Sequence, residues 1–299
     1  MVQKRTVGKT VFDIINYTLL AAIAIACVLP MWHVFSASFS DPSKLLAAKG
    51  TILWPLGNAT AEGYRIVFND ANIATGYGNT LVYVACYTLI GVTTTLIAGY
   101  ILSRPYFMFK NIITFLITFT MMFGGGMVPT FIVIRDLGMY DTRWAIILPG
   151  AMSVFNIIIM RTSIQGIPNS LEESAKLDGA GNMTILFQIF VPLLKATIAV
   201  IVLFLAVGMW NSWFQAMLYI RNKDLKPLQL VLREILLQND TSTMTQAAMQ
   251  GQANRQDIDQ YKRLVQYCTT IVATVPILCI YPFVQRYFVT GVMIGSLKG

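Results

Sequence analysis

Residues 71–103 read ANIATGYGNTLVYVACYTLIGVTTTLIAGYILS and contain no Asp, Glu, Lys or Arg. A helix needs about 20 residues to cross a hydrocarbon core of roughly 30 Å, so this stretch is long enough to span a membrane. Its apolar residues lie all around a helical wheel, which indicates that lipid or other spans surround it. Gly91, Thr95 and Gly99 recur at every fourth position and predict a close approach of a neighbouring helix.

Five further stretches lack these four charged residue types. They are residues 14–40, 111–134, 144–160, 196–220 and 264–285. Charged residues make up 12% of the chain, against about 25% in soluble proteins, and the mean hydropathy is +0.61. The first stretch continues through Trp32, beyond the roughly 7–15 apolar residues of a signal peptide, so we interpret it as a retained helix. The sequence predicts an all-α membrane protein with six transmembrane helices.

The basic residues predict the orientation. An even number of spans places both termini on one side of the membrane. Lys4, Arg5 and Lys9 precede the first span, and Arg104 and Lys110 lie in the connection between the second and third. Because Lys and Arg near span ends stay in the cytoplasm, both termini are expected there. The predicted parts are a cytoplasmic tail over residues 1–13, a six-helix transmembrane domain over 14–288, and a cytoplasmic tail over 289–299.

The connection over residues 221–263 is extracytoplasmic in this topology, and it is longer than ordinary helix connections. Its first part, residues 227–238, begins with proline and places its apolar residues on one face. It therefore predicts an amphipathic helix at the outer membrane surface. The second part, residues 239–260, is polar and poor in apolar anchors.

Composition excludes several functions. The net charge of +8 is scattered between apolar runs, which argues against a nucleic-acid partner. With one histidine and four cysteines that lack C-x-x-C spacing, we expect neither a metal site nor a catalytic cluster. Gly8-Lys9-Thr10 lacks the first glycine and the preceding strand of a phosphate-binding loop, so we expect no ATP or other cofactor on this chain.

Two alternatives in other classes stay open. A polytopic membrane enzyme such as a lipid-linked glycosyltransferase would need charged catalytic residues at span ends. Arg135, Asp136, Asp141 and Arg143 form the candidate cluster for that chemistry. A channel or secondary transporter would show ionisable residues within the spans, and no Asp, Glu, Lys or Arg is present there.

The connection between the fourth and fifth spans carries the most informative segment. Residues 168–181 read PNSLEESAKLDGAG. Ser170 followed by Glu173 has the spacing of a capping box, in which each side chain bonds the other residue's amide. Gly179 stands where a left-handed glycine would end the helix about two turns later. A short helix is therefore predicted in this connection.

This segment resembles a family signature. Glu173-Ser174-Ala175, Gly179, Ile189 and Val191-Pro192 follow the spacing E-A-A-x3-G-x9-I-x-L-P of permease subunits of bacterial ABC importers. Ser174 replaces alanine and Val191 replaces leucine. Asn79-Thr80, Trp210-Asn211 and the segment GVMIGSLKG over residues 291–299 extend the similarity to the carbohydrate branch. Within it, the chain resembles the smaller permease of maltose-type systems that import complex oligosaccharides.

The resemblance implies a type I ABC importer permease fold in the bacterial cytoplasmic membrane. It implies that residues 161–192 form a cytoplasmic coupling loop, and that residues 221–263 face a binding protein. The implied partners are a second, different permease subunit, an ATPase dimer that holds ATP and Mg²⁺, an extracytoplasmic binding protein and an oligosaccharide. The implied ATPase-coupling residues are Ser170, Glu172, Glu173, Ala175, Asp178 and Gly179.

Six residues are candidates for the translocation pathway. Trp210, Asn211, Trp213 and Gln215 lie near the outward end of the fifth span, and Gly124 and Gly125 lie in the middle of the third. A buried Asn amide needs hydrogen-bond partners, and a sugar hydroxyl or a neighbouring helix would both serve. The glycines and Pro129 predict a break in the third span, either lining the pathway or forming an inert kink.

Overall fold

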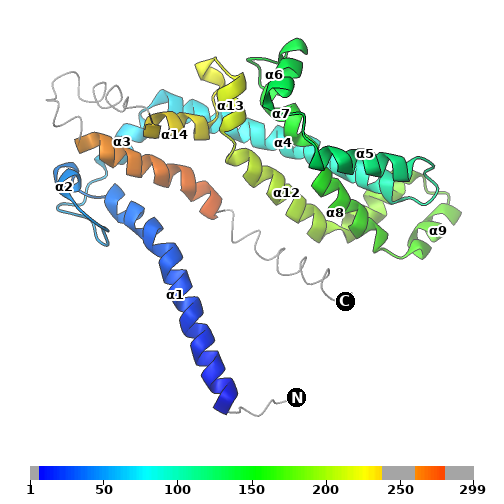
Figure 1. Cartoon of the computed structure of the whole chain (residues 1–299), viewed down its shortest axis with the longest axis horizontal. Helices are drawn as coiled ribbons and strands as arrows, with labels where there is room; N and C mark the ends of the chain where they lie inside the picture. The colour runs from blue at the N-terminus through cyan, green and yellow to red at the C-terminus, as the bar shows by residue number, and fades with distance from the viewer. Residues whose placement is uncertain (1–6, 238–259, 280–299) are drawn as a thin grey trace. The chain divides into compact units, whose positions relative to one another are not determined.

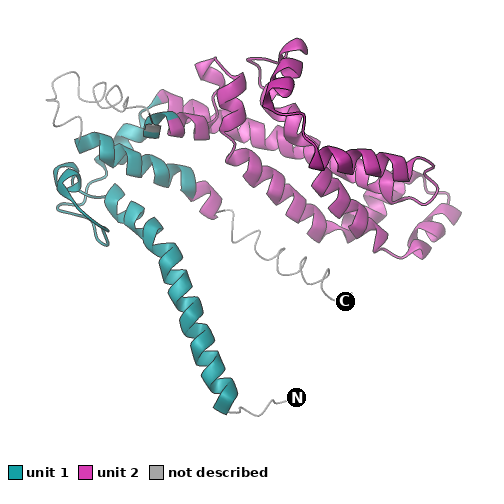
Figure 2. Ribbon diagram, in the orientation of Figure 1, with its two compact units in different colours: residues 1–70, 234–274 teal, residues 71–233, 275–299 magenta. Residues whose placement is uncertain are grey.

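The computed structural model describes residues 7–237 and 260–279 (Figure 1). Helices are the only regular elements within these two ranges, which confirms the all-α prediction. The chain divides into two compact units (Figure 2). The first comprises residues 1–70 and 234–274, and the second comprises residues 71–233 and 275–299.

The first unit begins with the long helix α1, Val7–Ser38, which starts inside the predicted tail over residues 1–13. Only the last three residues of α1 are buried, and most of its large apolar side chains are exposed. Such exposure suits a helix that faces lipid. The short helices α2 (Pro42–Ala47) and α3 (Glu62–Phe68) follow.

Residues 260–279 form a further helix, and its first part packs within the first unit. Gly63 of α3 permits this contact, because a Cβ there would lie 2.6 Å from Cys268 Sγ and 2.7 Å from Leu264 Cγ. Cys268 Sγ also donates to the Ser38 carbonyl at 3.3 Å. The sixth predicted span, residues 264–285, extends outside the described residues from 280 onward.

The second unit is organised around α4, Ala71–Ser103 (Figure 1). It packs against three helices, α7 (Trp144–Ala151), α8 (Val154–Gln165) and α12 (Lys195–Trp210). A Cβ at Gly91 would lie 2.7 Å from the Ala151 carbonyl oxygen, and one at Gly99 would lie 2.7 Å from Met160 Cγ. The small residues of α4 therefore permit the close helix contacts that the sequence predicts.

Two of the predicted spans are bent, and a third bend directly precedes the predicted fifth span. The helices α1 and α4 are long and apolar enough to cross a membrane unbroken, and three bent pairs raise the number to as many as five within the described residues. The pairs are α5 (Lys110–Met122) with α6 (Met127–Asp136), bent by 115°, α7 with α8, bent by 44°, and Asn182–Leu193 with α12, bent by 86°. Bends of this size have local causes such as proline or π-helical geometry.

The third bend follows an irregular segment. It consists of α10 (Asn182–Thr184), the π-helix η1 (Ile185–Phe190) and α11 (Val191–Leu193). Pro192 lies two residues after the end of the π-helix, and it has no N–H for a helical hydrogen bond. The signature residues Ile189, Val191 and Pro192 thus mark the point where the chain turns into α12.

The second unit continues through α13 (Phe214–Tyr219) and η2 (Lys223–Leu225) to the first part of α14 (Leu228–Leu237), up to Arg233. The amphipathic helix is formed, but the apolar face that we expected at the membrane surface is buried in the protein at Leu228, Val231 and Leu232. Gly76 makes this possible, because a Cβ there would lie 3.1 Å from Leu228 Cα. Of the predicted polar part, residues 239–259 lie outside the described residues.

Candidate functional site

Helix α9, Asn169–Leu177, is the short helix that the signature segment predicts. Its end is a Schellman motif, in which Gly179 has φ +80°. The Gly179 N–H donates to the Lys176 carbonyl at 3.0 Å, and the Ala180 N–H donates to the Ala175 carbonyl at 2.9 Å. Glycine suits this left-handed position because it has no Cβ. The predicted stop at Gly179 is confirmed.

The predicted capping box is wrong. The helix begins two residues earlier than a Ser170 N-cap requires, and the preceding Pro168 has the extended backbone of an N-cap (φ −57°, ψ 132°). No side chain caps this helix start. Because α9 already includes Ser170, this residue is inside the first turn and is not at the N-cap position where it could pair with Glu173.

The two faces of α9 have different surroundings. Glu172 and Ala175 are buried, and Ala175 joins an apolar cluster that includes Ile164 and Leu186. The exposed face of α9 consists of Ser170, Glu173, Ser174 and Leu177. These residues recur at helical spacing and share one side of the helix. The Leu177 side chain stands out, because its exposed fraction is 90%.

Glu172 forms a buried ion pair with Arg104, the residue that follows α4. The exposed fractions of the two side chains are only 7% for Arg104 and 8% for Glu172. Lys176 Nζ lies 2.7 Å from Glu172 Oε1, and Arg104 Nε donates to Ser103 Oγ at 2.9 Å. Burial lowers the pKa of the Arg104 guanidinium, yet arginine keeps its proton at neutral pH. Two cations thus compensate the Glu172 carboxylate.

Aromatic rings surround the same charges. The Arg104 guanidinium carbon lies 4.8 Å from the centroid of the Tyr100 ring and 5.1 Å from that of the Phe190 ring. Lys176 Nζ lies 4.5 Å from the centroid of the Tyr106 ring. These distances allow cation–π attraction, at the buried Arg104 and at the partly exposed Lys176. Glu172 therefore points into the protein and away from the exposed face of α9.

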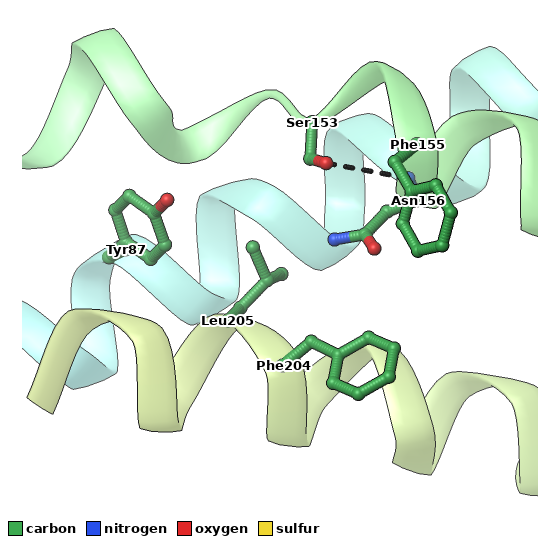
Figure 3. Close-up of a pocket in the computed structure, with 6 residues that line it drawn as sticks. All are labelled: Tyr87, Ser153, Phe155, Asn156, Phe204 and Leu205. Atoms are coloured by element: carbon green, nitrogen blue, oxygen red, sulfur yellow. Dashed lines mark hydrogen bonds between the residues drawn. The ribbon is translucent and has the colours of Figure 1, made fainter. Parts of the chain in front are cut away.

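A cavity of about 410 Å³ lies between α4, α8 and α12 (Figure 3). Its lining residues are Tyr87, Ser153, Phe155, Asn156, Phe204 and Leu205. It sits beside the break between α7 and α8, where Ser153 Oγ accepts from the Asn156 backbone N–H at 3.4 Å. Figure 3 shows the carboxamide of Asn156 pointing toward the α12 side of this space. The lining thus combines aromatic rings with an amide and a hydroxyl.

The predicted pathway residues at the end of α12 do not line this cavity. Trp210 is buried and packs edge-on against Tyr77, with ring centroids 6.1 Å apart. Asn211 is exposed, and its Nδ2 donates to the Val207 carbonyl at 3.0 Å. The Asn211 amide therefore bonds to its own helix. The sequence suggests a sugar hydroxyl or a neighbouring helix as its partner, and the observed bond differs from both.

The remaining pathway candidates lie in two other places. The Arg233 guanidinium lies 3.3 Å from the Trp213 ring centroid, and Gln215 is half-buried in α13. Gly124 and Gly125 are exposed in the break between α5 and α6, so the predicted break is confirmed. Whether these residues line the pathway stays a prediction.

The charged cluster considered for a membrane enzyme has structural partners. Arg135 pairs with its neighbour Asp136 at 3.1 Å, and both side chains are exposed. Asp141 Oδ1 accepts from the backbone N–H groups of Asn222 at 2.9 Å and Arg221 at 2.7 Å. These bonds lower the pKa of the Asp141 carboxyl. Asp141 thus connects its own loop to the loop at residues 221–222 and has a structural role.

The sequence matches the family model described as "Binding-protein-dependent transport system inner membrane component" over residues 91–294. The chain belongs to this family. It is 38% identical to the polygalacturonan/rhamnogalacturonan transport system permease protein YtcP of Bacillus subtilis, over 96% of this chain and 98% of that protein. Protein LplC of the same organism is 34% identical, over 98% of this chain and 97% of that protein.

A solved structure agrees with this membership. A bacterial ABC transporter involved in the import of the acidic polysaccharide alginate has a chain that is 30% identical, with a TM-score of 0.87. The match covers 96% of this chain and 100% of that one. The protein is therefore a non-catalytic permease subunit of an ABC importer with the type I fold, and the resemblance seen in the sequence is confirmed. A polytopic membrane enzyme is not favoured.

Sequence reasoning missed three residues of the candidate sites of this permease. Arg104 is the charge that ends the longest uncharged run, but no spacing rule connects it with Glu172 68 residues later. Asn156 is a single polar residue between apolar neighbours in the sequence, and this pattern is only a weak indication of a polar site. Leu177 is an apolar residue on the exposed face of α9. Its spacing of four residues from Glu173 was the feature of the sequence that could have placed it on that face.

Proposed function

We propose that this permease pairs with a second, different permease subunit and imports uronate-containing oligosaccharides across a bacterial cytoplasmic membrane. Support comes from the names of two similar proteins, which refer to polygalacturonan and rhamnogalacturonan in one case and to alginate in the other. Both names denote acidic polysaccharides. In this proposal an extracytoplasmic binding protein delivers the sugar.

The ATPase dimer, which holds ATP and Mg²⁺, docks on the exposed face of α9. The observation that carries this proposal is the contrast between the two sides of the helix. One side is fixed by the Glu172 ion pair and by Ala175, while the other presents Leu177 with an exposed fraction of 90%. An exposed leucine next to the carboxylate of Glu173 suits a protein partner with an apolar pocket and a basic rim.

This docking sets the orientation of the chain. Because an ATPase that uses cellular ATP works in the cytoplasm, α9 faces the cytoplasm, and an even number of spans then places both termini there. Asp141 and the segment that starts at Arg221 are on the opposite side, toward the binding protein. The basic residues near the span ends agree with this orientation.

The cavity between α4, α8 and α12 is our candidate for a part of the sugar pathway. Tyr87, Phe155 and Phe204 offer ring surfaces for the apolar faces of sugar rings. Asn156 is buried, with an exposed fraction of 4%, and a buried amide requires hydrogen-bond partners. Hydroxyl groups of a passing sugar would supply them.

Uptake into proteoliposomes tests this function. The complex of both permeases and the ATPase should import short oligogalacturonates when ATP and the loaded binding protein are present, and it should not import neutral malto-oligosaccharides. Asn156→Leu should lower uptake about tenfold, which corresponds to the loss of roughly one hydrogen bond to the sugar. Import of the neutral sugar alone would contradict the substrate class. Unchanged uptake by Asn156→Leu would remove the cavity from the pathway.

A further inference from the structure

Helix α4 is fastened at its C-terminal end to the coupling helix α9. Arg104 follows the last residue of α4, and its partner Glu172 belongs to α9. The pair is buried, and the guanidinium is held by Ser103 and by the Tyr100 ring, both from α4. A charge-assisted contact between two groups that are both fixed in this way holds the two helices in one relative position.

The other end of α4 is fastened to the segment that precedes α14. Asn79 Nδ2 donates to the carbonyls of Asp224 at 2.6 Å and Lys226 at 3.1 Å. Tyr83 Oη donates to the Leu225 carbonyl at 2.6 Å. The N–H of Leu228, the first residue of α14, donates to Thr80 Oγ1 at 2.8 Å. Arg143, which precedes α7, holds the Asn79 carboxamide by donating from Nη2 to Asn79 Oδ1 at 3.2 Å.

The helix between these attachments is continuous. From Asn79 to Ser103 it comprises 25 of the 33 residues of α4 and no proline, which gives a length of about 38 Å at 1.5 Å per residue. Asn79, Thr80 and Tyr83 are all nearly inaccessible to solvent, with exposed fractions of 1–4%. Buried polar contacts thus hold α4 near both of its ends.

We propose that α4 is a rigid rod that joins α9 to the segment 222–228, so that these three elements move as one body during transport. Arg104 and Asn79 are positioning residues at its two ends. The inference rests on the proposed docking of the ATPase on α9. When the loaded binding protein docks, the rod transmits the resulting movement to the ATPase. When the ATPase dimer closes, the rod transmits that movement to the extracytoplasmic side of the permease.

The first test compares two cations that share one carboxylate. Arg104→Met breaks the link between α4 and α9, whereas Lys176→Met removes an ion pair within α9 and keeps an unbranched stem over the Tyr106 ring. ATP hydrolysis is measured on the purified complex in nanodiscs, with and without sugar-loaded binding protein. We expect at least a tenfold loss of stimulation for Arg104→Met and less than a twofold change for Lys176→Met. Equal stimulation in both variants would overturn the proposal.

The second test asks whether the two ends act together. Asn79→Leu should also reduce stimulation, and the double variant with Arg104→Met should be no worse than the poorer single variant. Substitutions at distant, independent sites normally have additive free energies, so their fold-losses would multiply. Multiplied losses in the double variant would show two unconnected structural effects and would contradict the rod.

Two outcomes need separate controls. Should Arg104→Met fail to assemble, Arg104→Lys replaces it, since lysine keeps the charge but not the planar fork that bonds both Ser103 and Glu172. Its stimulation should fall at least threefold below that of Lys176→Met, and equality would overturn the proposal. A wild-type complex without any stimulation would instead contradict the proposed function, so the two failures are distinguishable.

Discussion

Replacing Gly179 with valine should lower sugar uptake and stimulated ATP hydrolysis at least tenfold while the permease still assembles. Gly179 has φ +80°, a conformation that costs an L-residue about 1–2 kcal/mol and a β-branched residue more. No atom lies within 4 Å of a Cβ placed there, so the cost comes from the backbone alone. The bond from Ala180 to Ala175 would be lost, and the exposed face of α9 would shift.

A matched control separates backbone strain from side-chain bulk. Gly179→Asn introduces a side chain of similar size, but asparagine tolerates the left-handed region better than valine does. It should retain most of the uptake and of the stimulated hydrolysis, measured on the same purified complex in proteoliposomes. Wild-type coupling in Gly179→Val would contradict the role of this helix end.

Leu177→Asp should weaken binding of the ATPase to the permease by at least tenfold. Full burial of a leucine side chain contributes about 1.5–3 kcal/mol, and 1.4 kcal/mol corresponds to a factor of ten in affinity. Because the exposed fraction of Leu177 is 90%, the substitution should leave the fold of the permease intact. A fluorescence titration of labelled ATPase against detergent-solubilised permease measures the change.

The conservative variant Leu177→Met should bind the ATPase within about threefold of wild type, because methionine fills irregular apolar pockets well. The introduced charge is then responsible for the loss in Leu177→Asp. Unchanged affinity in Leu177→Asp would show that the ATPase docks elsewhere.

Local patterns predicted the helices and their ends better than the contacts between them. The uncharged runs identified the spans, and the spacing of Gly179 from the start of α9 identified its end, because both depend on neighbouring residues. The break at Gly124 and Gly125 was also predictable from composition. Its angle of 115° was not, because the packing of the helices on either side sets it.

The parts that sequence reasoning missed depend on distant residues. The pair between Arg104 and Glu172 joins residues 68 positions apart, and the contact of α14 with α4 depends on the space left by Gly76. The N-cap of α9 was misplaced by two residues, because the extended Pro168 is the N-cap and Ser170 lies inside the first turn.

Cross-linking tests the central claim, that the exposed face of α9 contacts the ATPase. In a background with the four native cysteines replaced, Leu177→Cys is combined with single cysteines around the apolar pocket of the ATPase, and Leu137→Cys serves as the comparison. Leu137 is also exposed, but it follows α6, on the side assigned to the binding protein. We predict an intermolecular disulfide from position 177 that changes in yield with ATP, and none from position 137. A cross-link from position 137, or none from position 177, would contradict the account.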